Sequence, residues 1–399
     1  MRVLVTTTGY PGHVMPVLPF ARAFQRRGHE VCVAGPRSAG TLLRDAGLAF
    51  CGWSDPPSAQ VAAVVGKAAR LAPEAGHALM IAEGFGRVAT RAALPEVLHL
   101  VGAWRPDVVV RESQEFAGHL AAERHRVAQA RIALGLAISE RETAALVAPT
   151  MQQLRAEHGL PPDPRGERVA GTPTFTLVPR ALEDREAPEA AATHRFRQPR
   201  QSAASLADWW PGNGDPLVYV TLGSVAAKLG YFPELYRAIC DALADVSARI
   251  LITTGPDGDL SGLGPLPTNV HVERWVAQEQ VMPHAAVVVC HAGYGTLLGA
   301  LAAGLPVVAM PLFAGDQWHN ARRLHHLGAG IALQDARPAM FDHPRKDLIA
   351  ALPRAVRRVL HEERHRAAAR RIASASAALP TVDAAADRLR DIAGNPAGD

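Results

Sequence analysis

The sequence predicts an α/β protein built from two tandem Rossmann-like domains, each with a doubly wound parallel sheet. Its 399 residues exceed what one ordinary hydrophobic core organises, which favours two domains. Short apolar runs alternate with helical segments, as in parallel sheets covered by helices. The same alternation restarts after a polar stretch near residue 216. We therefore expect an N-terminal domain over 1–198, a linker over 199–215, a C-terminal domain over 216–380 with a cleft between the domains, and a final helix over 381–399 that returns to the first domain.

The first half begins with the apolar run "RVLVT" and a segment with helical spacing. Residues 53–104 break this rhythm with Pro and Gly, so they form either a helical excursion or a wall of a ligand cleft. Residues 184–215 are polar and rich in Ala and Pro, which is typical of a linker. The expected order of the other elements is strand 2–6, helix 16–27, strand 29–35, helix 38–47, strand 106–111, helix 116–126 and strand 130–135.

The second half repeats the pattern with longer apolar runs, among them "LVYVTLGS" and "AAVVVCHAG". Runs of this kind are typical of strands buried on both faces. The expected order is strand 217–224, helix 233–244, strand 248–255, strand 269–275, strand 285–293, helix 295–304, strand 306–312 and a helix that starts near 316.

Composition excludes several classes of function. The net charge of +4 is small for this length and the basic residues are scattered among acidic ones, so we expect no nucleic-acid partner. The four cysteines lack metal-ligand spacing and favour a reducing, cytoplasmic setting. The N-terminal apolar stretch is too short for a signal peptide, and no run is long enough for a membrane span. We expect a monomer or homodimer that acts on small molecules.

The run "VVVCHAGYGTLLGALAAGLP" carries the clearest chemical signal. A buried strand delivers His291 into a glycine-rich turn that opens a helix. Gly293 and Gly295 allow close approach of a ligand, and the free N–H groups of a helix start favour an anion such as a diphosphate. An ordinary strand–turn–helix joint and an NAD fingerprint are the alternatives. The NAD pattern requires an acidic residue after the next strand, where Asp316 follows only after a longer loop.

The segments around this turn decide between these interpretations. The run from Trp275 to Gln317 resembles the donor-binding signature of inverting family 1 glycosyltransferases, which have the GT-B fold. The matching pieces are "WVAQ", "HAGYGT", "GLPVVAMP", "DQ" and the "TLGS" turn at 221–224. Within this family the chain is most similar to bacterial enzymes that glycosylate polyketide natural products, including those of enediyne pathways.

The resemblance implies a role for each matching residue. Trp275 would stack on the nucleotide base, the Val276 backbone would read its edge, and Gln278 would lie near the ribose. Asp316 and Gln317 would bind hydroxyls of the donor sugar. Stacking on an indole face and anion binding by amides and imidazole suit these roles. The implied diphosphate-binding residues are Ser224, His291, Gly293, Gly295 and Thr296.

One departure from the family pattern bears on the donor. Many members have a glutamate eight residues after the motif histidine, where it binds ribose hydroxyls, and this chain has Gly299 there. A donor without a 2′-hydroxyl has less need of that carboxylate. We therefore expect dTDP-sugars rather than UDP-sugars.

The stretch "TTTGYPGHVMP" places a histidine between the first strand and the first helix. The resemblance implies that His13 is the general base that deprotonates the acceptor hydroxyl, and Gly12 would let the turn approach the substrates. An imidazole suits proton transfer near neutral pH. A turn histidine with its ring in water is the alternative.

A carboxylate often orients such a base. The family often has an aspartate after a later strand, where this chain has Glu112, one methylene longer. Glu115 is a second candidate, whereas Asp107 begins the strand. Glu112 as a surface carboxylate paired with Arg111 is the structural alternative.

The sequence thus predicts a metal-independent glycosyltransferase without a cofactor. The "DGD" at 257–259 resembles a metal-binding motif of another transferase class but is expected to form a plain turn. The competing functions are an NAD(P)-dependent oxidoreductase, a sugar-nucleotide epimerase of the same fold, and a non-catalytic helper protein with a transferase fold.

Overall fold

The computed structural model describes residues 1–399 except 185–191, 200–213, 335–338, 345 and 395–399. Contacts among the described residues divide the chain into two compact units. The first unit falls within Met1–Pro179, Glu183–Pro199 and Leu379–Asp399, and the second falls within Arg180–Leu182 and Arg200–Ala378. The sequence-based limits at 198, 216 and 381 stay predictions, and residues 200–213 of the expected linker lie outside the described residues.

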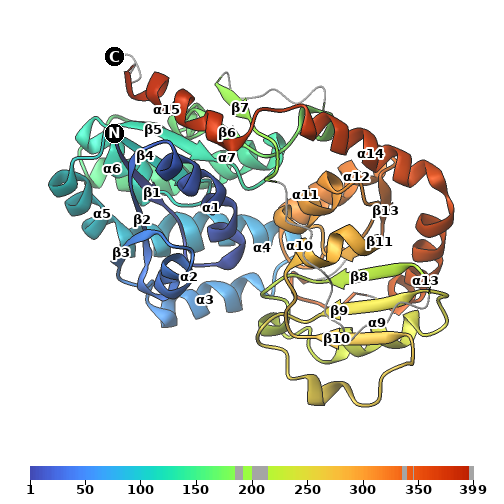
Figure 1. The fold of residues 1–399 in the computed structure, drawn as a ribbon. Coiled ribbons are helices and arrows are strands. Elements are labelled where there is room, and N and C mark those ends of the chain that lie inside the picture. The colour runs from blue at the N-terminus through green and yellow to red at the C-terminus, as the bar shows by residue number, and fades with distance from the viewer. Residues whose placement is uncertain (185–191, 200–213, 335–338, 345, 395–399) are drawn as a thin grey trace. The chain divides into compact units, whose positions relative to one another are not determined.

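The first unit is built on a seven-stranded parallel sheet in the order β3-β2-β1-β4-β5-β6-β7 (Figure 1). Strand β1 lies inside this sheet between β2 and β4, and the three parallel strands end at the same edge. The strands are β1 (Arg2–Thr6), β2 (Glu30–Pro36), β3 (Ala49–Trp53), β4 (Val108–Glu112), β5 (Ala128–Ile132), β6 (Thr174–Thr176) and β7 (Thr193–Arg195).

Helices cover both faces of this sheet. Apolar residues of the helices α5, α6 and α7 join those of the strands in one buried cluster. Helix α15, near the C-terminus, packs on α1, β4 and β5 of this first unit (Figure 1). The helices are α1 (Pro11–Arg26), α2 (Gly40–Asp45), α3 (Ser58–Ala68), α4 (Pro73–Leu79), α5 (Thr90–Trp104), α6 (Ala117–His125), α7 (Ala137–Glu157), α8 (Glu167–Ala170) and α15 (Ala385–Gly394), with short 3-10 turns η1 (Arg37–Ala39) and η7 (Val382–Ala384).

Residues 53–104 match the expected helical excursion, whereas residues 184–215 differ from the expected linker. Residues 53–104 contain the end of β3 and then helices, with the π-helix η2 (Met80–Ala89) between α4 and α5. The expected linker over 184–215 contains strand β7, which pairs with β6 at the edge of the sheet. Strand β7 has only three residues, too few for the alternation that identifies a strand in a sequence.

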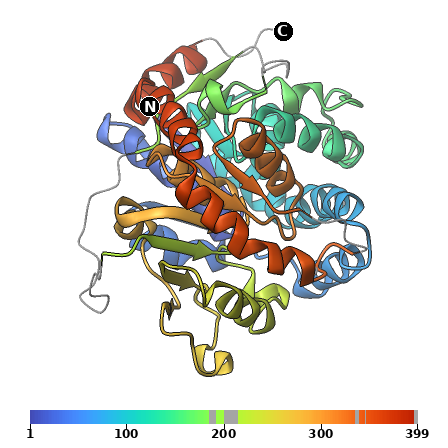
Figure 2. The same cartoon turned by 90° about the vertical axis from the view of Figure 1, so that its right-hand side faces the viewer.

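The second unit repeats the architecture with a six-stranded parallel sheet in the order β10-β9-β8-β11-β12-β13. Helices α9 and α13 pack on one face of this sheet and close the main core cluster. Helix α13 leads into α14, which packs on α11 (Figure 2). The strands are β8 (Leu217–Thr221), β9 (Arg249–Thr253), β10 (Val270–Glu273), β11 (Ala285–Cys290), β12 (Val307–Ala309) and β13 (Gly330–Ala332).

The helices of the second unit mostly follow the strands that the sequence analysis identified. They are α9 (Glu234–Leu243), α10 (Gln278–Val281), α11 (Tyr294–Ala302), α12 (Gly315–His326), α13 (Lys346–His361) and α14 (Glu363–Ala377), with 3-10 turns η3 (Arg180–Leu182), η4 (Ala227–Leu229), η5 (Leu260–Leu263) and η6 (Met282–His284). Among the described residues, no helix combines the length and the hydropathy needed to cross a bilayer. Both aspartates of the "DGD" turn contact other residues of the protein. Asp259 accepts a hydrogen bond from the Ser261 N–H, and Asp257 pairs with Lys228.

Candidate active site

His13 lies in the first turn of helix α1 rather than in a loop before it. The helix begins at Pro11, whose fixed φ and missing N–H suit the first helical position. The expected start near residue 16 is therefore wrong by one and a half turns. The Tyr10 carbonyl accepts hydrogen bonds from the N–H groups of His13 and Val14, which anchors the turn.

Glu112 is the last residue of β4, the strand that pairs with β1. The carboxyl ends of parallel neighbours meet at one edge of a sheet, so Glu112 lies beside the loop that leads from β1 to His13. The His13 Nδ1 and Glu112 Oε1 atoms are 3.1 Å apart. The Glu112 side chain is fully buried, and that of His13 is 17% exposed. The imidazole thus has one nitrogen held by a carboxylate and the other available for a proton.

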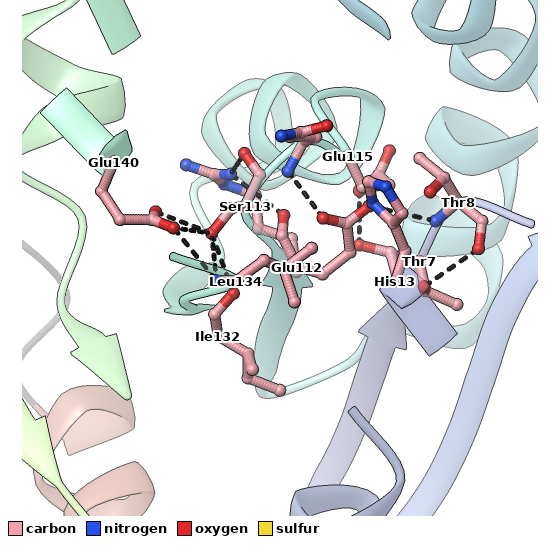
Figure 3. Close-up of polar contacts among 12 residues, drawn as sticks. Thr7, Thr8, His13, Glu112, Ser113, Glu115, Ile132, Leu134 and Glu140 are labelled. Carbon is pink, nitrogen blue, oxygen red and sulfur yellow. Dashed lines mark hydrogen bonds and ion pairs between the residues drawn. The ribbon is translucent and has the colours of Figure 1, made fainter. Parts of the chain in front are cut away.

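Backbone amides fix the orientation of the Glu112 carboxylate (Figure 3). Its Oε1 accepts a hydrogen bond from the Thr8 N–H at 3.3 Å, and its Oε2 accepts one from the Gln114 N–H at 2.7 Å. Burial alone would raise the pKa of Glu112, but the His13 ring and these two amides hold it below its ordinary value. The longer glutamate side chain therefore reaches His13 as an oriented anion.

The other acidic candidates have different partners. Glu115 accepts hydrogen bonds from Thr6 Oγ1 and the Gly118 N–H, and burial raises its pKa. Asp107 accepts the Arg2 N–H at the opposite end of β4. Arg111 donates to the Glu112 and Ser113 carbonyls, so the alternative of Glu112 as a surface carboxylate paired with Arg111 is wrong.

In the second unit, His291 directly follows β11 and lies in the glycine-rich turn before α11. A methyl group at Gly223 would come within 2.7 Å of the His291 ring, and one at Gly293 within 2.3 Å of Nε2. Both positions therefore require glycine while the ring keeps this place. A methyl group at Gly295 would meet no atom within 4 Å, so that glycine leaves open space at the helix start.

The His291 ring is 8% exposed and stacks on Phe313, with ring centroids 5.9 Å apart. Burial lowers the pKa of His291 to about 4, against the opposing effect of a hydrogen bond with the Thr221 backbone. The imidazole is therefore neutral near pH 7. A neutral ring and the first turn of α11, where no side chain caps the helix, can together offer N–H donors to an anion.

The remaining donor-site candidates are distributed around this turn. Gln278 Nε2 donates to Thr296 Oγ1 at 3.0 Å, which links α10 to the first turn of α11. Trp275 is 60% exposed, whereas Ser224 and Val276 are half-buried. Asp316 lies in the first turn of α12. The neighbouring Gln317 is buried, and its Oε1 accepts hydrogen bonds from the Leu312 and Phe313 N–H groups.

Two domain models of one family match almost the whole chain. They are described as the N-terminal and C-terminal domains of the erythromycin biosynthesis protein CIII-like family and match residues 22–223 and 237–392. The chain belongs to this family of glycosyltransferases. It is thus a bacterial natural-product glycosyltransferase of the GT-B fold, with two Rossmann-like domains.

Individual relatives match this glycosyltransferase over most of its length. It is 29% identical to the L-demethylnoviosyl transferase of Streptomyces niveus, over 98% of this chain and 97% of the relative. It is 30% identical to the demethyllactenocin mycarosyltransferase of Streptomyces fradiae, over 80% and 72%. The solved glycosyltransferase SnogD of Streptomyces nogalater shares 28% identity at a TM-score of 0.76, with 99% of both chains covered. The Streptomyces sp. SF2575 glycosyltransferase SsfS6, complexed with thymidine diphosphate, shares 25% at a TM-score of 0.73, over 98% and 99%.

Sequence reasoning missed two residues of this glycosyltransferase that contact candidate site residues, one in each unit. Phe85, from the π-helix η2, stacks on the His13 ring with centroids 5.2 Å apart. Asn320 is buried on α12 and its Nδ2 donates to the Ala292 carbonyl at 2.9 Å. Ala292 has a positive φ of 62°, so this bond holds the turn between His291 and α11 in an unusual conformation. The spacing of four residues from Asp316 places Asn320 on the same helix face and could have identified it.

Proposed function

We propose that the enzyme transfers a deoxysugar from a dTDP-sugar to a hydroxyl of a polyketide-type natural product, with inversion at the anomeric carbon and with His13 as general base. Enediyne acceptors are one candidate group within this class. The observation that carries the proposal is the pairing of the His13 ring with a buried, backbone-oriented glutamate. This arrangement suits a base that must become cationic during the reaction.

In the proposed step, the acceptor O–H proton moves to His13 Nε2 while the acceptor oxygen bonds to the anomeric carbon. The bond between that carbon and the diphosphate oxygen breaks on the opposite face, and dTDP leaves with the electron pair. Glu112 holds Nδ1–H and stabilises the imidazolium that forms. Its carboxylate orientation is set by amides before the reaction starts, so no reorganisation is required.

Residues of the second unit bind the nucleotide-sugar donor in this proposal. Trp275 presents an exposed indole for base stacking, with the Val276 backbone and Gln278 beside it. His291, Gly293, Gly295, Thr296 and Ser224 bind the diphosphate, where a neutral imidazole and helix amides supply donors. Asp316 binds a sugar hydroxyl. Gln317 does so through its Nε2, because its Oε1 already accepts hydrogen bonds from two loop N–H groups. Gly12 allows substrates to approach His13.

The preference for dTDP is supported by Gly299, which lies in α11 where many family members have a ribose-binding glutamate. It is also supported by the thymidine diphosphate that SsfS6 binds. A cytoplasmic location and a monomeric or homodimeric state stay predictions from the sequence.

The test is a transfer assay with dTDP- and UDP-linked sugars and a panel of polyketide aglycones. We expect a product whose mass gains one deoxyhexose and whose anomeric configuration, from proton coupling constants, is opposite to that of the donor. Retained configuration, or tighter binding of UDP than of dTDP, would contradict the mechanism or the donor assignment respectively. Epimerisation of the donor without any acceptor would favour the epimerase alternative, and dTDP binding without transfer to any acceptor would favour the helper protein.

A further inference from the structure

The helical run over 73–104 contains a ten-residue π-helix in its middle. Helix α4 continues without a break into η2 (Met80–Ala89) and then into α5. Single π-turns inside α-helices occur often at functional sites, and a stretch of this length is rare. The widened turns rotate the residues of η2 relative to those of the flanking α-helices. The structure thus gives Phe85 a direction that an uninterrupted α-helix would not give it.

Contacts with helix α7 fix one side of η2. Gly86 lies so close to α7 that a methyl group there would come within 2.6 Å of Val147 Cγ2. Thr150 Oγ1 donates to the Ala82 carbonyl at 3.2 Å, and Arg87 bridges from Glu83 to the Gln153 side chain. A close backbone approach, a hydroxyl hydrogen bond and the Arg87 bridge therefore hold η2 against α7. The residue between these contacts, Phe85, lies on the side of η2 that faces the candidate base.

Phe85 contacts His13 through its ring face. The centroids of the two rings are 5.2 Å apart and their planes differ by 29°, which is a stacked arrangement. Tyr10 packs its ring edge-on against Phe85 at 6.0 Å and lies 5.8 Å from His13. The Glu112 bond fixes one atom of the imidazole, but that bond alone leaves the plane of the ring free to turn. The Phe85 stack fixes the plane.

We infer that Phe85 is a positioning residue for the transfer reaction, which holds the His13 ring with Nε2 presented to the acceptor and favours its protonated form. The inference rests on the proposed base role of His13. A ring face carries negative charge density and attracts a cation stacked on it, so Phe85 favours the imidazolium that forms as the acceptor loses its proton. Phe85 acts before and during proton transfer without taking up the proton itself.

Few charged groups compete with this effect. Among the described residues, the titratable side chains in contact with the His13 ring are Glu112 from β4 and Tyr10 from the start of α1. The charged residues Glu83 and Arg87 of η2 pair with each other, and Arg87 also donates to the Gln153 side chain. Glu112 and Phe85 therefore act on the same ring from different directions, one through Nδ1 and one through the ring face.

The test compares Phe85→Leu and Phe85→Trp with Phe50→Leu as a control, because Phe50 is also half-buried in the first unit but does not contact His13. We expect F85L to lower kcat about twofold to fivefold or more, since a cation–π contact is worth at least that much when it is partly buried. The acceptor KM and the dTDP affinity should stay within about twofold. The acid limb of the pH profile should move to lower pH in F85L, because a base that gains less from its cation releases its proton more readily. F85W should restore most of the rate, and F50L should resemble the native enzyme.

A parallel NMR titration of the His13 ring separates this inference from the proposed function. F85L should move the protonation midpoint of His13 in the same direction as the kinetic limb. If neither the midpoint nor kcat changes, or if only the acceptor KM rises, Phe85 is not a positioning residue. If the midpoint moves and turnover does not, the contact stands but His13 is not the base. Thermal melts of F85L and F85W identify a loss that comes from unfolding, and a loss shared equally by F50L would overturn the inference.

Discussion

Two substitutions of Glu112 test separately the negative charge of this carboxylate and the length of its side chain. In Glu112→Gln the side chain keeps its length, and an amide oxygen can still accept the His13 Nδ1–H, but the negative charge is lost. In Glu112→Asp the charge is kept and the carboxylate withdraws by about 1.5 Å, the length of one carbon–carbon bond. The Nδ1 to oxygen distance of 3.1 Å would then exceed the hydrogen-bond range unless the backbone moves.

The expected size of the effect follows from the burial of this pair. A hydrogen bond to a charged group contributes about 1.5–3 kcal/mol, and Glu112 is fully buried with little solvent to screen it. Because each 1.36 kcal/mol changes a rate tenfold, E112Q should lower kcat roughly 10- to 150-fold. E112D should lose a comparable amount through distance. The acid limb of the E112Q profile should move to lower pH, since the imidazolium has lost its anion.

The assay is steady-state transfer at saturating donor across pH 5.5–9, with Glu115→Gln as the matched control. Glu115 is also buried, three residues after the end of the same strand, but its carboxylate contacts Thr6 and Gly118 instead of His13. E115Q should therefore retain turnover within about threefold. Turnover of E112Q within threefold of the native enzyme, or an equal loss in E115Q, would refute the role of Glu112.

Stability measurements on the same variants check a second consequence. The pKa of Glu112 is lowered in the folded protein, so its ionised form stabilises the fold above the unfolded value near 4.3. That contribution is lost as the pH falls through the folded value. The stability difference between the native enzyme and E112Q should therefore narrow in acid, and a difference that widens there would contradict the assignment.

Three further predictions concern the second unit. The pKa of His291 is about 4 in the folded protein and about 6.5 in the unfolded chain. Lowering the pH from 7.5 to 5 should therefore lower the free energy of unfolding of the native unit by about 2 kcal/mol, a loss that His291→Gln should not show. Free energies of unfolding from urea titrations that fall equally with pH in both proteins would contradict this. Asn320→Ala should weaken dTDP binding in calorimetry. Asn269→Ala also removes side-chain hydrogen bonds to backbone carbonyls, but it should destabilise the unit and spare dTDP affinity. Gly295→Ala should stabilise helix α11 by about 0.5–1 kcal/mol yet lower dTDP affinity, and unchanged affinity would remove Gly295 from the diphosphate site.

The fold was largely accessible from the sequence because its central strands are long, apolar and regularly spaced. Strands were expected at 2–6 and 285–293, and the structure has β1 over Arg2–Thr6 and β11 over Ala285–Cys290. The short strands β6, β7 and β13 have three residues each and carry no periodic signal.

The candidate site could be predicted only in part from the sequence. Glu112 was identified by its place after a strand, but its orientation depends on the amide of Thr8, 104 positions away in the chain. Phe85 reaches His13 through a π-helix, and no residue pattern distinguishes π from α periodicity over 53–104. The start of α1 at Pro11 could have been predicted, since proline favours the first helical position.

The most direct test of the central claim is the transfer rate of His13→Ala, measured with dTDP affinity on the same preparation. Because His13 belongs to the first unit and the nucleotide-binding candidates belong to the second, we expect turnover to fall by two orders of magnitude or more, about the contribution of a general base. Calorimetric dTDP affinity should remain within about twofold of the native value. Near-normal turnover in a folded His13→Ala protein would contradict the mechanism, because a group other than His13 would then have to take the acceptor proton.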